Sequence, residues 1–315
     1  MRRVALVDNP SSGQNSSRRE AIVRAAFAAL GDAGIEVERF TIHGPGSGAA
    51  LARQAVSHGF DTVVVCGGDG TVHEVMQGLV GTAVALGVIP LGTANALAAN
   101  LGLSRIPAKA LQALLKAEPV QVPVGRIFFH DPEGARHSRY FTVAAGVGPD
   151  ALLMARMDPL LKRRLGYVLY LFEALRIWIS HPFPLFPVSF ESAGGEPRLE
   201  RASQILAVRV RSFGGVLGRL APGATLHSRS LSVLTIKTRS RLRYMRFLLS
   251  ILAGRRDFSR DLELITADSV ECNPGNGSRA HIFVEADGEV LGHLPVRLEL
   301  ASETLTLLIP PHAEP

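Results

Sequence analysis

The chain has 315 residues, of which 47% are hydrophobic and 20% charged. A chain of this length can bury one large core or two ordinary ones, and two domains are the better expectation. The formal net charge of +6 favours anionic partners. Such partners are nucleotides, nucleic acid or an acidic membrane surface. Nucleic acid ranks last of the three, because no basic stripe with interleaved aromatic residues is present. Cys66 and Cys272 are isolated and lack metal spacing, which predicts core residues of a reduced, cytoplasmic protein.

The first third of the chain alternates between strand-like and helix-like segments. Short apolar runs predict strands over 4–7, 35–40, 62–66 and 84–89. The segments between and after them predict helices over 21–30, 49–58, 72–79 and 101–117. This order predicts an α/β domain with a doubly wound parallel sheet. In such sheets, ligands collect beyond the carboxyl ends of the strands.

A glycine-rich loop, Cys66-Gly67-Gly68-Asp69-Gly70-Thr71, joins a predicted strand to a predicted helix. Its three glycines leave no side chain to block a ligand. The start of the helix presents backbone N–H groups and a positive dipole end to an anion. The sequence therefore favours phosphate binding at this loop. The alternative is a tight strand–helix turn that merely requires positive φ.

Three further segments stand out beside this loop and the Glu74 that follows it. They are Asn9-Pro10-Ser11-Ser12-Gly13, Pro90-Leu91-Gly92-Thr93-Ala94-Asn95-Ala96-Leu97-Ala98 and Asp287-Gly288-Glu289. Together, the four segments resemble the motifs of the diacylglycerol kinase and sphingosine kinase superfamily, and the glycine-rich loop also resembles that of NAD kinases. In length and layout the chain is most similar to the bacterial lipid kinases that have a diacylglycerol kinase catalytic domain.

The resemblance implies a site for ATP with Mg²⁺ in the first domain. The residues it implies as nucleotide contacts are Asn9, Thr41, Gly67, Gly68, Asp69, Gly70, Thr71, Val72, His73, Gly92, Thr93 and Asn95. Asp69 would hold the magnesium of Mg-ATP through water, and His73 would be a donor near the nucleotide. Several of these residues have a structural alternative: Thr71 and Thr93 could cap the helices after them, Asn95 could close its loop by an Asx turn, and Thr41 could be an ordinary loop residue.

After the first domain, the regular alternation of predicted strands and helices ends. Residues 120–124 cross to a second region, in which short strands are predicted over 204–210, 231–237, 261–267, 281–285 and 296–300. Their irregular spacing, with turns between them, predicts a mainly antiparallel β-sandwich, as the resemblance also implies. We expect a kinase domain over 1–123, to which a strand within 303–315 returns, and a lipid-substrate domain over 124–302.

Asp287 and Glu289 are the candidate catalytic bases, one of which would accept the proton of the acceptor hydroxyl. This role is implied by the resemblance. From the residues alone, Asp287-Gly288 between Val284 and Val290 is a good hairpin turn, and that alternative stays open.

At one motif this chain differs from the related enzymes. Where they have an aspartate that holds a structural magnesium, the segment 222–231 has Ser228, followed by Arg229. A serine hydroxyl beside a full positive charge is a poor ligand for a hard dication. We therefore expect a structural magnesium site at Thr225, Ser228 and Ser230 to be weakened or absent. The segment 144–148 also lacks the asparagine of the corresponding family motif.

Two segments, 160–186 and 239–256, combine basic residues with apolar helical stretches. Neither is apolar over the roughly 20 residues that a membrane span requires. An interfacial helix uses such residues against anionic headgroups, whereas the alternative is a pair of amphipathic helices packed on the sheets. The leading expectation is a cytoplasmic, peripherally membrane-associated lipid kinase. An NAD kinase-like enzyme with a soluble substrate and a catalytically impaired nucleotide- or lipid-binding protein are the alternatives, and a homodimer is left open.

Overall fold

The computed structural model describes residues 1–10, 16–131, 133–157, 167–192, 194–212, 221, 223–252, 261–275, 281–311 and 313. The chain forms two compact units. Unit 1 consists of Met1–Val124 and Ser302–Pro315, and unit 2 consists of Gly125–Ala301. Residues 11–13 of the first motif, the basic residues 162–164 and 255–256, and residue 222 lie outside the described residues.

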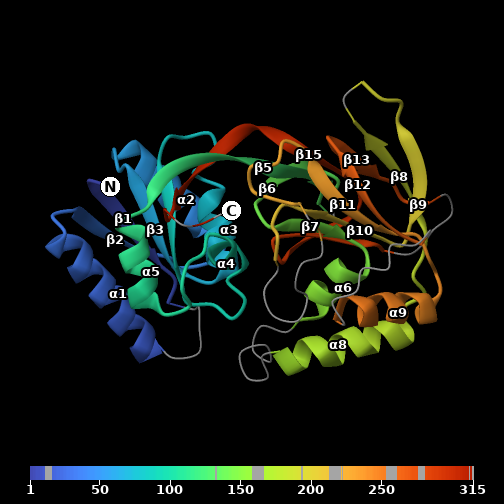
Figure 1. Cartoon of the computed structure of the whole chain (residues 1–315), viewed down its shortest axis with the longest axis horizontal. Helices are drawn as coiled ribbons and strands as arrows, with labels where there is room; N and C mark the ends of the chain where they lie inside the picture. Colours follow the sequence, from blue (N-terminus) through green and yellow to red (C-terminus); the bar gives the residue numbers. More distant parts are fainter. Residues whose placement is uncertain are drawn as a thin grey trace. The chain divides into compact units, whose positions relative to one another are not determined.

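Unit 1 is built on a parallel sheet (Figure 1). Its strands are β1 (Arg3–Asp8), β2 (Glu36–Thr41), β3 (Thr62–Gly67), β4 (Ala85–Pro90) and the end of β15 (Glu289–Ile309), in the order β2-β1-β3-β4-β15. Every residue of β3 and β4 is buried, as expected for strands covered on both faces. The predicted α/β class and parallel sheet are confirmed.

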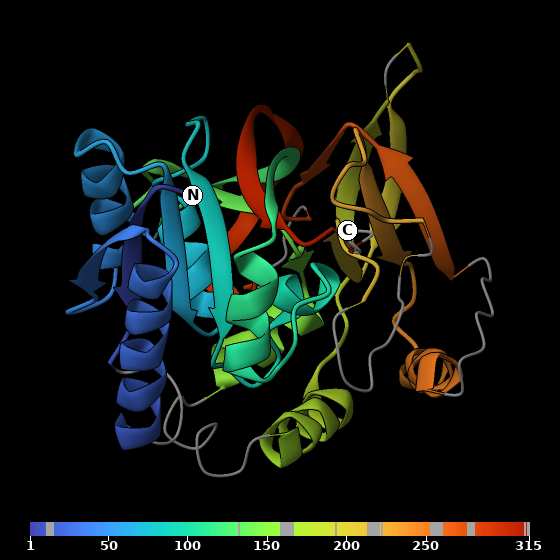
Figure 2. The same ribbon diagram turned by 60° about the vertical axis from the view of Figure 1, so that its left-hand side comes forward.

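The helices of this unit are α1 (Ser16–Asp32), α2 (Ser47–Ser57), α3 (Asp69–Met76), α4 (Ala96–Asn100) and α5 (Pro107–Leu114). Helices α1 and α5 contact each other, as do α2 and α3 (Figures 1 and 2). The predicted helix over 101–117 is wrong. Gly102 at φ +68° follows the end of α4, and Pro107 begins α5 after an extended Ile106. Proline disfavours helical backbone in the residue before it, so the segment divides there.

Unit 2 is mainly antiparallel. Its strands are β5 (Glu118–His130, which begins in unit 1), β6 (Arg136–Phe141), β7 (Ala144–Val147), β8 (Phe186–Glu191), β9 (Arg198–Ala202), β10 (Gln204–Val208), β11 (Leu231–Ile236), β12 (Leu262–Ala267), β13 (Ser269–Cys272), β14 (Phe283–Ala286) and the first part of β15. One path runs β12-β11-β10-β7-β14-β15, and a branch runs from β15 through β13 and β8 to β9. The predicted sandwich is confirmed, although β6, β7, β8, β9 and β13 were not predicted.

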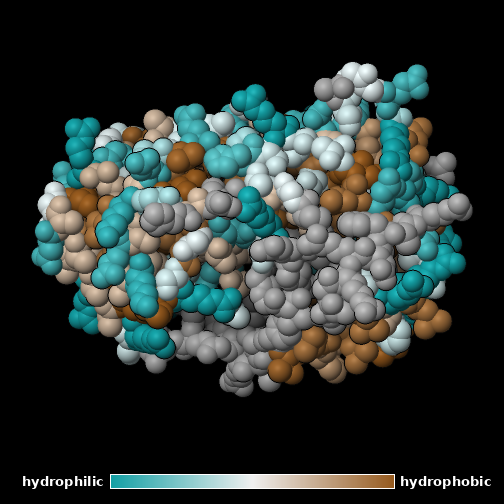
Figure 3. All heavy atoms as spheres, in the orientation of Figure 1, coloured by the Kyte–Doolittle hydropathy of each residue, from teal (hydrophilic) through white to brown (hydrophobic). Residues whose placement is uncertain are grey.

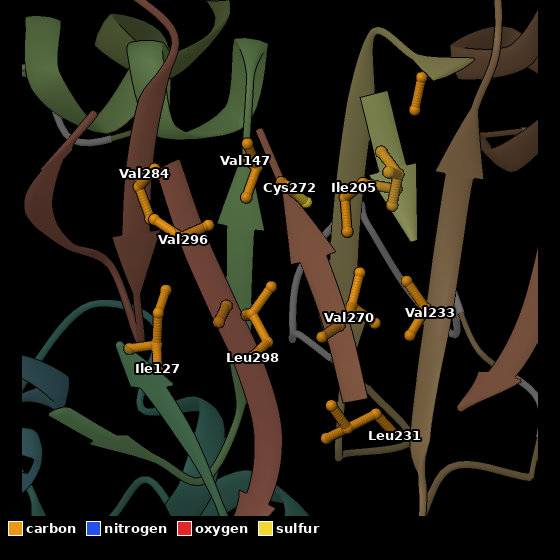
Figure 4. Packing of buried hydrophobic residues seen from close by; sticks show 14 of the residues in the cluster. Ile127, Val147, Ile205, Leu231, Val233, Val270, Cys272, Val284, Val296 and Leu298 are labelled. Atoms are coloured by element: carbon orange, nitrogen blue, oxygen red, sulfur yellow. The ribbon is translucent and has the colours of Figure 1, made fainter. Parts of the chain in front are cut away.

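The core of unit 2 lies between these two sets of strands (Figure 4). Val147, Ile205 and Val233 come from one set, and Val270 and Leu298 come from the other; all five are fully buried. Cys272 belongs to the same cluster, and burial raises the pKa of its thiol. Burial likewise raises the pKa of Cys66 in unit 1 to about 12. Both cysteines are therefore unreactive core residues.

Among the described residues of unit 2, three helices accompany these strands: α6 (Pro149–Arg156), α8 (Tyr167–Ser180) and α9 (Arg241–Leu252). Helix α6 contacts β14 and α8, and α8 contacts α9. Within the described ranges, no helix is both long enough and apolar enough to cross a membrane.

Candidate active site

The glycine-rich loop follows directly from the end of β3. Gly67 is the last residue of that strand, Gly68 is the N-cap residue of α3, and Asp69 begins the helix. The Val72 N–H closes the first turn on the Gly68 carbonyl at 3.1 Å. The N–H groups of a first helical turn have no helical acceptor. They therefore point out of the carboxyl edge of the sheet, where an anion can bind.

Packing within the protein disfavours a side chain at three glycines of the two loops: Gly67, Gly68 and Gly92. A Cβ on Gly92 would lie 2.7 Å from the Gly68 Cα, and a Cβ on Gly68 would lie 3.1 Å from the Gly92 Cα. A Cβ on Gly67 would lie 2.7 Å from the Thr71 Cβ. The β3–α3 and β4–α4 loops thus approach each other through their backbones, and glycine at these positions has a structural cause.

Gly70 differs from its neighbours. A Cβ there would meet no described atom within 4 Å, and its φ is not positive. Neither packing within the described residues nor backbone conformation demands a glycine at this position. Open space beside the first turn of a helix is compatible with a bound phosphate group.

The side chains of Asp69 and Asn95 hold the two loops together. The Asp69 carboxylate accepts the Asn95 N–H at 2.8 Å and the Ala96 N–H at 2.7 Å, which places its charge at the start of α4. The Asn95 side chain accepts the Gly92 N–H at 2.9 Å and donates to the Gly92 carbonyl at 2.7 Å. Asn95 has φ +51° and is buried. The loop-closing alternative for Asn95 is thus what the structure shows.

The other predicted nucleotide contacts gather at the same strand ends. Asn9 donates from Nδ2 to the Thr71 Oγ1 at 3.2 Å. Thr71 and Val72 are buried, as is His73, whereas Thr93 is exposed. Neither Thr71 nor Thr93 is an N-cap residue, since Gly68 has this position in α3 and Asn95 has it in α4.

Thr41 is positioned by an ion pair that sequence reasoning missed. Its hydroxyl donates to the Asp8 Oδ1 at 3.0 Å. Asp8 is buried and accepts two bonds from the Arg39 guanidinium, at 2.9 and 3.1 Å. Arg39 also binds both oxygens of Glu20, and these two carboxylates raise its pKa. The available signal was the polar residues at the ends of two predicted strands, of which β1 is largely buried and β2 is mostly not.

In unit 2, Asp287 and Gly288 form the two-residue turn between β14 and β15, with φ +48° and +84°. Both angles are those of a type I′ hairpin. The Asp287 carboxylate accepts the N–H groups of Thr142, Val143 and Ala144 at 2.8–2.9 Å and the Thr142 hydroxyl at 3.2 Å. It therefore ties the hairpin to the segment between β6 and β7. Glu289, by contrast, is exposed.

A second pair of acidic residues lies in this region and was not predicted. A Cβ on Gly146 would lie 1.8 Å from an Asp150 oxygen and 2.9 Å from a Glu285 oxygen, so the two carboxyl groups are neighbours. Burial raises the pKa of Asp150 to about 7, although hydrogen bonds from the Ala151 and Asp150 N–H groups and from the Gln204 side chain act to lower it. Burial and the charge of Asp150 raise the pKa of Glu285 well above its ordinary value. One proton or more is held by this pair at neutral pH.

The residues present do not fit the structural magnesium that the family resemblance implies. Thr225 and Ser228 are hydrogen bonded to each other, at 3.2 Å between hydroxyl oxygens. The Leu226 and Ser228 carbonyls accept bonds from the Arg209 Nη2, at 2.9 and 3.3 Å. Arg209 is 1% exposed. A guanidinium already supplies a positive charge to these carbonyls, and a dication beside it would be repelled.

Comparison with known proteins agrees with this architecture. Residues 3–127 match the diacylglycerol kinase catalytic domain, and residues 141–309 match the YegS C-terminal NAD kinase beta sandwich-like domain. A protein of Chromohalobacter salexigens named "Probable lipid kinase YegS-like" is 31% identical over 97% of this chain and 92% of that protein. A diacylglycerol kinase of Mycobacterium tuberculosis is 28% identical over 98% of this chain and 96% of the relative.

Solved structures share the fold. A diacylglycerol kinase of Bacillus anthracis superposes with a TM-score of 0.67 at 19% identity, covering 99% of this chain and 98% of that one. Yeast NADH kinase superposes with a TM-score of 0.53 at 12% identity, covering 98% and 83%. Taken with the sequence matches, these findings show that the chain belongs to the family of diacylglycerol kinase-like lipid kinases that includes the YegS proteins.

Proposed function

We propose that this protein is an ATP- and Mg²⁺-dependent kinase that phosphorylates a hydroxyl group of a diacylglycerol-, sphingoid- or related lipid at a membrane surface. The observation that supports ATP binding is the open space beside Gly70 at the first turn of α3. The lipid part rests on the family and on the names of the relatives. In this proposal unit 1 binds the nucleotide and unit 2 binds the lipid.

The phosphate chain of ATP lies against the first-turn N–H groups of α3 in this proposal, with Thr71, Asn9 and Thr93 near its oxygens. Asp69 fits the role of an outer ligand to nucleotide-bound magnesium, because a carboxylate fixed by backbone N–H groups is a hard oxygen donor. Bound magnesium would neutralise charge on the phosphates. The Asp69 and Asn95 contacts keep both loops in position before the nucleotide arrives, which lowers the cost of binding.

Between the two candidate bases, the contacts favour Glu289. The oxygens of Asp287 accept four hydrogen bonds from the 142–144 segment, and bonds to an anionic carboxylate make it a weaker base. We assign Asp287 as a positioning residue that fixes the hairpin on which Glu289 stands. Glu289 is exposed and accepts the proton of the lipid hydroxyl in this scheme.

A soluble nucleotide substrate is the second candidate, favoured by the structural likeness to yeast NADH kinase. The two are separated by incubating the purified protein with γ-labelled ATP, a panel of micellar lipids, and NAD in parallel. Label in a lipid that depends on added Mg²⁺ supports the proposal. Label in NAD alone supports the second candidate. Binding of ATP and liposomes without transfer indicates a catalytically impaired binding protein.

A further inference from the structure

Helix α8 presents an apolar stripe to solvent. Five large apolar residues recur along it at helical spacing, with exposed fractions of 50–64%: Val168, Leu171, Phe172, Leu175 and Ile179. Its opposite side is buried through Leu169, Glu173 and Ile177. Ordinary surface helices place polar residues on the outer face, whereas the outer face of α8 carries this apolar stripe. A contiguous apolar surface of this kind marks an interaction site.

Helix α9 continues this surface and adds positive charge. The Trp178 indole of α8 donates to the Arg241 carbonyl at the start of α9, at 2.9 Å. Figure 3 shows the apolar surface over the two helices, along the lower edge of the view. Leu242 and Leu249 of α9 are 77% and 55% exposed. Arg241, Arg243 and Arg246 are exposed on the same helix.

A groove beside α9 also combines basic and polar side chains. It has a volume of about 170 Å³ and lies between this helix and the ends of β11 and β12. Arg243, Arg246, Thr238 and Ser250 line it, together with Asp261, which pairs with Arg243 at 2.8 Å. Arg246 and the two hydroxyls of this groove are donors that suit the phosphate and ester oxygens of lipid headgroups.

We propose that the α8 stripe and the α9 arginines form the surface by which this protein docks on an anionic bilayer. The proposal deepens the proposed function, because a kinase acting on a membrane lipid must meet that lipid at the bilayer. Charge complementarity favours the anionic bilayer over a second copy of this chain, since a symmetric pairing of this face would bring like-charged arginines together. The stripe enters the interfacial region, and the arginines contact the headgroups.

The test is sedimentation of the full chain with vesicles of phosphatidylcholine alone and of phosphatidylcholine with phosphatidylglycerol, without ATP. The doubly substituted Leu171→Ser/Phe172→Ser protein should lose at least about tenfold in partitioning to the anionic vesicles, because two large apolar groups no longer enter the interface. Leu199→Ser is the matched control: Leu199 is 79% exposed on β9, and its substitution should change nothing. Arg241→Gln/Arg246→Gln should weaken binding to anionic vesicles only.

Equal partitioning of the Leu171→Ser/Phe172→Ser and wild-type proteins would overturn the proposal, as would a loss of self-association on that substitution with no loss of vesicle binding. Thermal melting of each variant verifies folding. The assay requires no phosphoryl transfer, so the two proposals fail separately. Vesicle binding without phosphorylation of any lipid leaves the docking surface standing and contradicts the kinase proposal.

The contacts of Arg209 carry an independent inference. Its buried guanidinium donates to the Leu226 and Ser228 carbonyls. Burial lowers the pKa of Arg209 to about 10, and the charge of Asp287 opposes this shift, so the guanidinium stays charged at neutral pH. We infer that Arg209 replaces a structural metal ion in unit 2, holding the 224–228 segment with an internal cation. The folded state of this unit then has no dependence on divalent metal, unlike that of a protein whose metal is part of its fold.

Thermal melting of the full chain with EDTA and with Mg²⁺, both without nucleotide, tests this inference. The wild-type protein should melt at the same temperature in both, and Arg209→Met should melt lower in both. The doubly substituted Arg209→Met/Ser228→Asp protein should regain melting temperature with Mg²⁺ but not with EDTA, because a carboxylate then stands beside the freed carbonyls. A wild-type melting temperature that falls in EDTA would overturn the inference, as would an Arg209→Met protein that melts like wild type.

Discussion

Gly68 and Gly92 face each other so closely that a Cβ on Gly92 would stand 2.7 Å from the Gly68 Cα. This contact joins the loops after β3 and β4, and the hydrogen bonds of Asp69 to Asn95 and Ala96 reinforce it. The two loops therefore form one rigid element at the carboxyl edge of the sheet in unit 1. In the proposed function, this arrangement holds the anion site in place before the nucleotide binds.

Replacing either glycine of this contact should destabilise the protein. Gly92→Ala forces a methyl group against backbone, which costs about 1–3 kcal/mol. Gly68→Ala should cost less, because its Cβ would have 3.1 Å rather than 2.7 Å to the nearest atom. Thermal melts of the two variants measure the difference. Equal and unchanged melting temperatures would show that the loops separate easily.

The two acidic residues of the β14–β15 hairpin should respond differently to amide substitution. Asp287→Asn replaces an acceptor oxygen with a donor that faces N–H groups of residues 142–144, and one unsatisfied buried contact costs about 1–3 kcal/mol. It should therefore lower both the melting temperature and the activity. Glu289 is exposed, so Glu289→Gln should change the melting temperature less than Asp287→Asn does.

Activity decides the assignment of the base. Loss of general-base catalysis typically costs about 10²–10⁴-fold in rate, so Glu289→Gln should lower kcat by that much while the KM for ATP stays near the wild-type value. If Glu289→Gln retains the wild-type kcat, Glu289 is not the base. Loss of activity in Asp287→Asn with an unchanged melting temperature would return the role to Asp287.

The Asp150–Glu285 pair should make stability depend on pH. Both folded-state pKa values are raised above the ordinary ones, that of Asp150 from 3.8 to about 7. The folded state therefore holds more protons than the unfolded state between these values, and stability falls as pH rises from about 4 through about 7. The melting temperature of Asp150→Asn/Glu285→Gln should vary less over this range than that of wild type. An unchanged slope would show that the pair does not bind the extra proton.

Elements with a strong local pattern could be predicted from the sequence. The apolar run at 62–66 predicted β3, because strand burial depends on nearby residues. A helix was also predicted after the glycine loop, over 72–79, but α3 begins three residues earlier, at Asp69. The break between α4 and α5 also had a local signal, Gly102 followed by Pro107, although the prediction spanned it. Strand β13 has only four residues, and its pairing with β15 and β8 has no local signature.

The parts of the site that escaped prediction depend on contacts distant in sequence. Asp8 and Arg39 pair from neighbouring strands of the sheet, and Asp287 binds a segment about 145 residues earlier in the chain. The Asp150–Glu285 pair is likewise created by the pairing of β14 with β7. A single sequence does not reveal which distant backbone groups will saturate a carboxylate. The difference in surroundings between Asp287 and Glu289 therefore required the fold.

The central claim is that the first turn of α3 binds the phosphates of ATP, and nucleotide binding by Gly70→Ala tests it most directly. Gly31→Ala is the matched control, since Gly31 also lies in a helix where a Cβ would meet no described atom within 4 Å. Alanine favours helix, by about 1 kcal/mol over glycine, so neither variant should melt below wild type. Calorimetric titration with Mg-ATP should show at least about tenfold weaker binding for Gly70→Ala, equivalent to about 1.4 kcal/mol, and wild-type affinity for Gly31→Ala. Wild-type affinity in Gly70→Ala would contradict the account.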